Sequence, residues 1–236
     1  MNIELPNGYP IKDGLTQMPG VETRDLIIIL PGITGSVLAR KDPKGGKLAD
    51  LWAPSGQALW QALKSFGASL GELHVPRHDP TRPAPESDIV PTRVVQDFHG
   101  VLGLAKIDGY TQVAKTILDN FDVTDGRGFE WFPYDWRLSN RHSAMRLAEF
   151  IKPRLQAWRV THGADARVVL VAHSMGGLVS RYYLEVLDGG HWPDCRALIT
   201  FGTPYRGSLD AVNYLANGFK KFAPSLFCVG SFEVRR

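Results

Sequence analysis

The sequence predicts an α/β protein in which a mostly parallel sheet is flanked by helices, and three observations support this prediction. The chain has 236 residues, of which 44% are hydrophobic, and this is enough to build the core of one such domain. Short apolar runs typical of buried strands alternate with segments of helical periodicity. No internal repeat interrupts this order, so we expect a single α/β domain over residues 25–236.

The first ordered element is expected just after a polar N-terminal arm. Residues 1–24 are rich in proline and glycine, which predicts a flexible segment, with order beginning at Asp25. A continuous apolar run over Leu26–Leu30 then predicts a buried strand. A proline and a glycine end it, so we expect a tight loop over 31–36.

The core pattern stops over residues 41–91, which predicts an insertion outside the sheet. Such an insertion can form a cap or lid, or it can be a short helix packed on the core, and the sequence leaves both open. Its helical part is indicated by the spacing of Leu59, Leu63, Phe66 and Leu70. Five prolines between 76 and 91 predict an extended stretch after that helix.

Strands and helices then alternate to the end of the predicted sheet. Helical spacing begins at Tyr110 and continues to Ile117, and an aromatic strand runs from about Phe129 to Pro133. A longer helix follows, with Ser139 or Asn140 as its cap, a kink at Pro153 and an apolar face made by Leu147, Ile151, Leu155 and Trp158. The last two strands are expected at Val168–Val171 and Ala197–Pro204.

A serine follows the buried run Val168–Val171 directly, and a helical pattern starts behind it. Ala172, Ser174 and Gly176 match the form small-x-Ser-x-Gly. Hydrolases of the α/β type hold their nucleophile in this strand-to-helix turn, because the serine backbone is strained and bulky neighbours would collide. We therefore predict that Ser174 is a nucleophile; the alternative is a serine that only caps a helix.

Acyl transfer also needs backbone donors aimed at the oxygen that becomes negative. Met175 follows the serine and begins the helix, so its amide can be one donor. The glycine-containing loop after the first strand can supply the second, and we assign it to the amide of Ile33. A dinucleotide-binding loop is the competing interpretation, but Gly32 and Gly35 lack the spacing that it requires.

Composition limits the partners and the setting. The formal net charge is +3, and no basic run is interleaved with aromatic residues, so nucleic acid is not an expected partner. The N-terminus has no apolar signal region, and no stretch of about 18 apolar residues occurs, which predicts a cytoplasmic protein. Cys195 and Cys228 have no metal-ligand spacing, so we expect buried thiols. The predicted serine chemistry needs neither metal nor cofactor.

Four stretches, in order, resemble the lecithin:cholesterol acyltransferase family: PGITGSVL, FPYDWRLS, AHSMGG and FGTPYRGS. The resemblance covers about residues 25–210 and implies an α/β-hydrolase fold, a Ser-Asp-His triad and a lid that touches lipid. It also implies acyl transfer from phospholipid to an alcohol or water, with transient membrane contact. Trp52 falls in the expected lid segment and is predicted to bind substrate. No cysteine precedes Cys195, so a disulfide-closed lid is not expected.

Three polar residues near these motifs invite catalytic interpretations. Asp135 and Arg137 are instead expected to form a structural ion pair at a strand end, with aromatic residues packed around it. His173 precedes the serine on the strand, so its ring should point away from the hydroxyl. We interpret it as a packing or hydrogen-bonding histidine.

A serine nucleophile needs a histidine base, held by an acid, and both should lie on later loops. The one histidine after Ser174 is His191, which is expected about 18 Å away at the opposite edge of the sheet. Asp194 shares this location, and Asp210 follows the next strand too soon to be the usual acid. We therefore expect the chain to stop after about the sixth core strand, with the strands that carry the acid and the base absent. This leaves two hypotheses: part of a serine lipase or O-acyltransferase, or an inactive lipid-binding or vestigial module.

Overall fold

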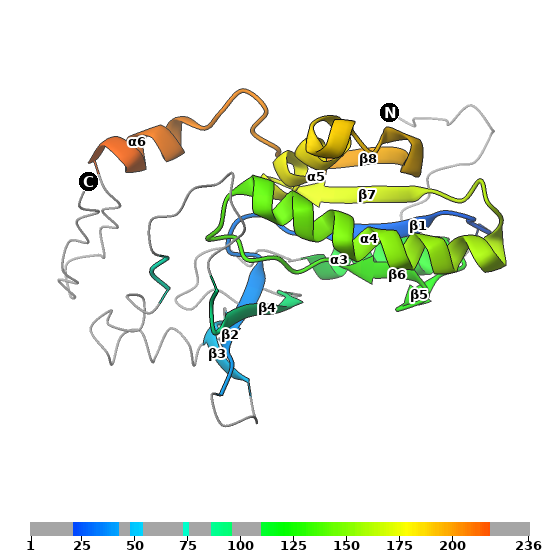
Figure 1. Cartoon of the computed structure of the whole chain (residues 1–236), viewed down its shortest axis with the longest axis horizontal. Coiled ribbons are helices and arrows are strands. Elements are labelled where there is room, and N and C mark those ends of the chain that lie inside the picture. Colours follow the sequence, from blue (N-terminus) through cyan, green and yellow to red (C-terminus); the bar gives the residue numbers. More distant parts are fainter. Residues whose placement is uncertain (1–20, 43–47, 54–72, 76–85, 96–109, 218–236) are drawn as a thin grey trace, which may run out of the picture.

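A computed structural model describes residues 21–42, 48–53, 73–75, 86–95 and 110–217. Its centre is a five-stranded, wholly parallel sheet with the order β5-β6-β1-β7-β8 (Figure 1). The strands are β1 (Leu26–Leu30), β5 (Thr124–Asp125), β6 (Gly128–Trp131), β7 (Val168–His173) and β8 (Cys195–Phe201). The predicted α/β class with a mostly parallel sheet is confirmed. Five strands of this sheet fall within the described residues, against about six expected.

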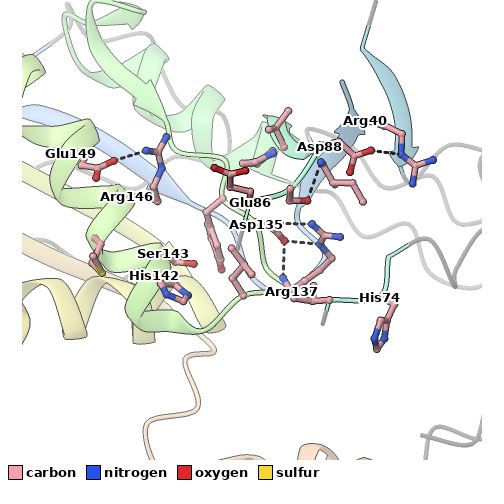
Figure 2. A pocket seen from close by; sticks show the side chains of 18 residues that line it. Arg40, His74, Glu86, Asp88, Asp135, Arg137, His142, Ser143, Arg146 and Glu149 are labelled. Atoms are coloured by element: carbon pink, nitrogen blue, oxygen red, sulfur yellow. Dashed lines mark hydrogen bonds and ion pairs between the residues drawn. The ribbon is translucent and has the colours of Figure 1, made fainter. Parts of the chain in front are cut away.

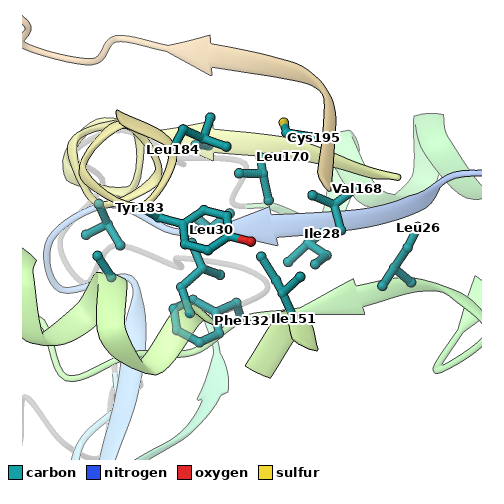
Figure 3. Close-up of a cluster of buried hydrophobic side chains, with 14 of the residues drawn as sticks. Leu26, Ile28, Leu30, Phe132, Ile151, Val168, Leu170, Tyr183, Leu184 and Cys195 are labelled. Atoms are coloured by element: carbon teal, nitrogen blue, oxygen red, sulfur yellow. The ribbon is translucent and has the colours of Figure 1, made fainter. Parts of the chain in front are cut away.

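Helices cover both faces of the sheet, as parallel connections require. They are α3 (Tyr110–Asn120), α4 (Asn140–His162) and α5 (Met175–Glu185). Leu26, Ile28 and Leu30 of β1 belong to the core that the sheet shares with α4 and α5, which Figure 3 shows. The intervening Ile27 and Ile29 pack with α3 on the other face. This alternation along one strand gives the molecule its three layers.

The α4 helix has the predicted cap and the predicted buried face. The Ser139 side chain accepts a hydrogen bond of 3.2 Å from the amide of Arg141, so Ser139 is the cap. Leu147, Ile151 and Leu155 are buried, and the helix continues through Pro153.

A second, antiparallel sheet with the order β3-β2-β4 lies outside the main sheet. Its strands are β2 (Ser36–Arg40), β3 (Ala49–Trp52) and β4 (Ile89–Val94). The sequence does not predict these three strands, because they are short and lack a regular alternation of polar and apolar residues. Pro91 is accommodated because β4 is an edge strand. The predicted helix around Leu59–Leu70 lies outside the described residues.

Val21, which lies in the expected N-terminal arm, is hydrogen-bonded to the end of α3 and the residues after it. The amide of Val21 donates to the Asn120 carbonyl at 2.8 Å, and its carbonyl accepts from Asp122 at 3.1 Å. These bonds join residues from the expected N-terminal arm to the end of α3. At the other end of the described chain, α6 (Leu209–Asn217) follows β8.

Candidate functional site

Ser174 lies in the turn between β7 and α5, at the carboxyl edge of the main sheet. Its backbone has φ 49° and ψ −118°, a conformation that non-glycine residues rarely adopt. Its side chain is half-buried, and its amide donates to the Phe201 carbonyl at 2.7 Å. The turn thus holds the hydroxyl at the end of a strand in the strained form typical of a nucleophilic serine.

Three glycines allow neighbouring backbone to approach this turn. A Cβ atom on Gly32 would lie 3.0 Å from the Cβ of Ser174, so the loop after β1 packs directly against the serine. A Cβ on Gly176 would lie 2.6 Å from the Pro31 carbonyl oxygen, and one on Gly177 would overlap the side chain of Thr203. The glycines therefore let α5 begin in contact with β1 and with the segment after β8.

Side chains and backbone from several elements hold the carbonyl groups of the 31–36 loop. The donors come from the turn after β6, from β3, from the end of β4 and from the loop itself. The bonds are Tyr134 Oη to Pro31 O (2.8 Å), Gly35 N to Gly32 O (3.1 Å), Thr34 Oγ1 to Ile33 O (2.6 Å), Trp52 Nε1 to Thr34 O (3.0 Å), Val95 N to Gly35 O (2.9 Å) and Trp136 Nε1 to Ser36 O (3.1 Å). Every carbonyl of the loop is therefore satisfied, which fixes the direction of its amides.

The amide of Ile33 stays available in this arrangement. The bond from Gly35 to Gly32 closes a β-turn, and Thr34 has the positive φ (63°) that a type II turn needs at this place. In a trans peptide the N–H points opposite to the C=O, so the amide of Ile33 points away from that turn. The Ile33 amide has no acceptor among the described residues. Met175 is the first residue of α5, and amides in the first turn of a helix lack intrahelical acceptors.

His173 forms a hydrogen bond, as the sequence predicts. Its Nδ1 lies 2.9 Å from the hydroxyl of Tyr110, and the same hydroxyl accepts a bond of 2.7 Å from the amide of Gly32. Burial lowers the pKa of the His173 imidazole below its ordinary value of 6.5 and so favours the neutral ring. From the sequence, Tyr110 is predicted only as part of a helix. Its bond to Gly32 could not be predicted, because no local pattern links two residues 78 positions apart.

Trp52 supports the loop beside the serine. Besides its bond to Thr34, its ring meets that of Trp136 edge to face at 5.5 Å between centroids. Both indoles therefore pack against each other and bind the same loop. The predicted contact of Trp52 with substrate stays a prediction.

Asp135 and Arg137 form the structural ion pair that the sequence predicts. The guanidinium donates to both carboxylate oxygens, at 2.8 and 2.6 Å, and the side chains are only 9% and 6% exposed. They line a cavity of about 670 Å³ beside the first turns of α4 (Figure 2). Arg40 and Arg146 also line it, and they pair with Asp88 and Glu149 respectively. The described residues that line it do not include Ser174.

Two of the downstream candidates, His191 and Asp194, lie at the edge of the sheet opposite Ser174. Val168 pairs with Cys195 and His173 with Phe201, so β7 and β8 have their amino and carboxyl ends at the same two edges. His191 stacks on Tyr183 just before β8, at the amino edge, about 17 Å from the serine turn along β7. Asp194, also at that edge, binds Arg159 at 2.8 Å. Asp210 lies in the first turn of α6, and its side chain is outside the described set.

In the part of the chain that the structure describes, the side chains that commonly bind metals are dispersed. No three His, Cys, Asp or Glu residues of the described ranges group closely enough to hold a metal ion. Cys195 is a buried thiol whose pKa is raised by burial to about 11, and Cys228 lies outside the described residues. Within the same ranges, no helix is long and apolar enough to span a bilayer.

The chain is similar to several known proteins. Phospholipase A(1) LCAT3 from Arabidopsis thaliana is 26% identical over 206 residues, which cover 82% of this chain and 44% of that protein. Human lysosomal phospholipase A and acyltransferase is 27% identical over 136 residues, 56% of this chain and 31% of the human protein. The crystal structure of a Tle4-Tli4 complex aligns with a TM-score of 0.45 at 16% identity, over 88% of this chain and 50% of the other.

The chain spans less than half the length of these two curated relatives. The family model described as lecithin:cholesterol acyltransferase matches residues 69–228, which is more than half of the chain. This range contains the turn after β6, the serine turn and the segment after β8. The chain therefore belongs to the lecithin:cholesterol acyltransferase family.

Proposed function

We propose that this chain carries the nucleophile of a lipid-acting serine acyl hydrolase or O-acyltransferase. Its substrates are phospholipids or other fatty acyl esters, met through transient contact with a lipid surface. The observation that supports this best is the strained turn at Ser174, with Gly32 packed against the serine. The names of two relatives, a phospholipase A(1) and a lysosomal phospholipase A and acyltransferase, point to the same chemistry.

In the proposed reaction the Oγ of Ser174 attacks the ester carbonyl carbon. A histidine base accepts the hydroxyl proton, and the carbonyl oxygen becomes an oxyanion that the amides of Ile33 and Met175 stabilise. The tetrahedral intermediate collapses, the alcohol leaves with the proton, and the acyl group stays on Ser174. Water or an acceptor alcohol then attacks the acyl-serine, which yields a fatty acid or a new ester and restores the hydroxyl.

The base and the acid come, in this proposal, from outside the described residues. His173 is unsuited to the role of base, because its Nδ1 binds Tyr110 and it precedes the serine on the strand. His191 lies at the opposite edge of the sheet. The same two observations favour the alternative, an inactive lipid-binding or vestigial module, if no other histidine reaches Ser174.

A fluorophosphonate probe separates these possibilities, because it labels an activated serine covalently. We expect the chain to be labelled and Ser174→Ala to abolish the labelling. Ser208→Ala is the matched control, because it removes a serine hydroxyl between β8 and α6 and should leave the labelling unchanged. An activated ester should then give a burst of about one product per chain, the sign of an acyl-enzyme. A chain that is folded but unlabelled would contradict the proposal and support the inactive module.

A further inference from the structure

One hydroxyl connects the loop after β1 to the strand that carries the serine. The Oη of Tyr110 accepts the amide proton of Gly32 at 2.7 Å and lies 2.9 Å from Nδ1 of His173. A phenol has a single proton to donate, and its oxygen accepts through lone pairs. The arrangement is therefore complete when Tyr110 donates to an unprotonated Nδ1, which places the proton of neutral His173 on Nε2.

A second tyrosine holds the other side of the same peptide unit. The C=O of Pro31 and the N–H of Gly32 belong to one planar group, and they bind Tyr134 and Tyr110 respectively. Two hydroxyls on opposite sides of a planar group fix its orientation. The next peptide unit carries the Gly32 carbonyl, bound by Gly35, and the Ile33 amide. Only the φ and ψ angles of Gly32 separate the two units, so holding the first unit restricts the orientation of the second.

The loop is shaped to admit the Tyr110 hydroxyl. A Cβ on Gly35 would lie 2.9 Å from this oxygen, so even an alanine there would displace it. Tyr110 is half-buried at the first position of α3, and burial raises the pKa of its phenol, which therefore stays protonated as a donor. The contacts therefore run from Gly32 through the Tyr110 hydroxyl to His173, which is the residue immediately before Ser174.

We propose that Tyr110 is a positioning residue for acyl transfer at Ser174. Its hydroxyl, held by His173, fixes the Gly32 peptide and thereby aims the amide of Ile33 at the developing oxyanion. This inference rests on the proposed function of Ser174. Preorganised donors stabilise a transition state because they need no reorientation during the reaction, so a loop free to rotate would lose part of that stabilisation.

The test measures two quantities in the 236-residue chain: the rate at which a fluorophosphonate labels Ser174, and kcat and KM for an activated ester. Losing an oxyanion donor typically costs 10²–10³-fold in kcat, so misaiming one in Tyr110→Phe should cost about 10- to 100-fold, with KM nearly unchanged. His173→Asn keeps an acceptor near the place of Nδ1 and should retain most of the rate. His173→Leu removes the acceptor and should slow the reaction as Tyr110→Phe does. Tyr182→Phe is the control, because it removes a tyrosine hydroxyl on α5 and should leave the rate unchanged.

Amide hydrogen exchange at Gly32 gives a readout that does not depend on activity. Exchange should be slow in the wild type and in His173→Asn, and faster in Tyr110→Phe and His173→Leu. If Ser174 is labelled at equal rates in the wild type and Tyr110→Phe, the positioning role is wrong while the proposed function stands. If the folded wild type is not labelled at all, the proposed function fails and the positioning role fails with it.

Discussion

Tyr134 and Pro31 are 103 positions apart in the chain, and the hydroxyl of Tyr134 donates a hydrogen bond of 2.8 Å to the Pro31 carbonyl oxygen. The same turn provides two more bonds, from the Tyr134 amide to Ser36 Oγ (3.0 Å) and from Trp136 Nε1 to the Ser36 carbonyl (3.1 Å). The polar and aromatic turn after β6 therefore holds both ends of the loop beside Ser174. These hydrogen bonds explain why a tyrosine stands at position 134 and a tryptophan at position 136.

Tyr134→Phe keeps the buried ring and removes the donor to Pro31. The carbonyl then has no partner in a site that excludes water, so the free energy of unfolding should fall by about 1–3 kcal/mol. Urea denaturation measures the change. Tyr205→Phe is the control, because its ring is 43% exposed and its loss should stay below about 0.5 kcal/mol. Equal losses for the two variants would contradict a structural role for the Tyr134 hydroxyl.

The main sheet could be predicted because its information is local. Continuous apolar runs such as Leu26–Leu30 identify the central strands, and the small residues around Ser174 identify the turn. The ion pair of Asp135 and Arg137 was also predictable, since the two lie two positions apart and can meet without a particular fold.

Two features of the site could not be predicted because they depend on distant pairing. The sheet of β2, β3 and β4 forms from segments with no clear alternation, whose paired residues are as far apart in the chain as Ser36 and Val94. Tyr110 reaches Gly32 across 78 positions, and only the packing of α3 on the sheet places its hydroxyl there. A hydrogen bond between a side chain and a distant part of the backbone cannot be predicted from a pattern in a single sequence.

The pair Asp135–Arg137 should show strong coupling, because both side chains are almost fully buried. Arg137→Met leaves an unpaired buried carboxylate and should cost about 3–5 kcal/mol of stability, whereas Asp135→Leu combined with Arg137→Met should cost much less than the sum of the single losses. A double-mutant cycle from urea unfolding gives the coupling. The exposed pair Arg181–Glu185 is the control, expected to couple by about 0–1 kcal/mol. Additive losses at 135 and 137 would contradict a buried pair.

The two glycines that open α5 should differ in whether a second substitution rescues them. Alanine at 176 meets the backbone oxygens of Leu30 and Pro31, and alanine at 177 meets the side chain of Thr203. Each should lose about 1–3 kcal/mol through overpacking. Thr203→Ala should restore much of the loss of Gly177→Ala and none of that of Gly176→Ala, as thermal unfolding of the four variants can show. Rescue of both, or of neither, would contradict these contacts.

Asp25 should make stability depend on pH below its ordinary pKa of 3.8. Burial alone would raise its pKa, but hydrogen bonds from the Arg196 guanidinium and the Arg167 amide hold it lower in the folded state. The unfolded chain therefore binds a proton first as pH falls, and the stability present above pH 3.8 is lost as pH falls through the folded pKa. Asp25→Asn should be less stable at pH 7 by about 1.5–3 kcal/mol, with a difference that shrinks in acid. A difference that is independent of pH would exclude ionisation as its cause.

Because the backbone of Ser174 is strained, we predict that replacing this serine with glycine raises the stability of the protein and abolishes its activity. A non-glycine residue at φ 49° and ψ −118° is strained by about 1–3 kcal/mol, and glycine relieves this strain at a cost of about 0.4–1 kcal/mol in chain entropy. Ser174→Gly should therefore be more stable than the wild type by about 1 kcal/mol, while Ser174→Ala, which keeps the strain, should stay close to it. Both variants lose the hydroxyl and should be unreactive towards fluorophosphonate.

The comparison of glycine with alanine isolates the strain, because the two variants lack the same hydroxyl and differ only by a methyl group. Equal stabilities in urea would mean that the turn relaxes around alanine and stores no strain at position 174. A glycine variant that is more stable and unreactive would instead mean that the fold keeps a serine here against its own stability. The acyl transfer proposed for this hydroxyl would explain such a serine, which stands at the carboxyl edge of β7 with Gly32 packed against it.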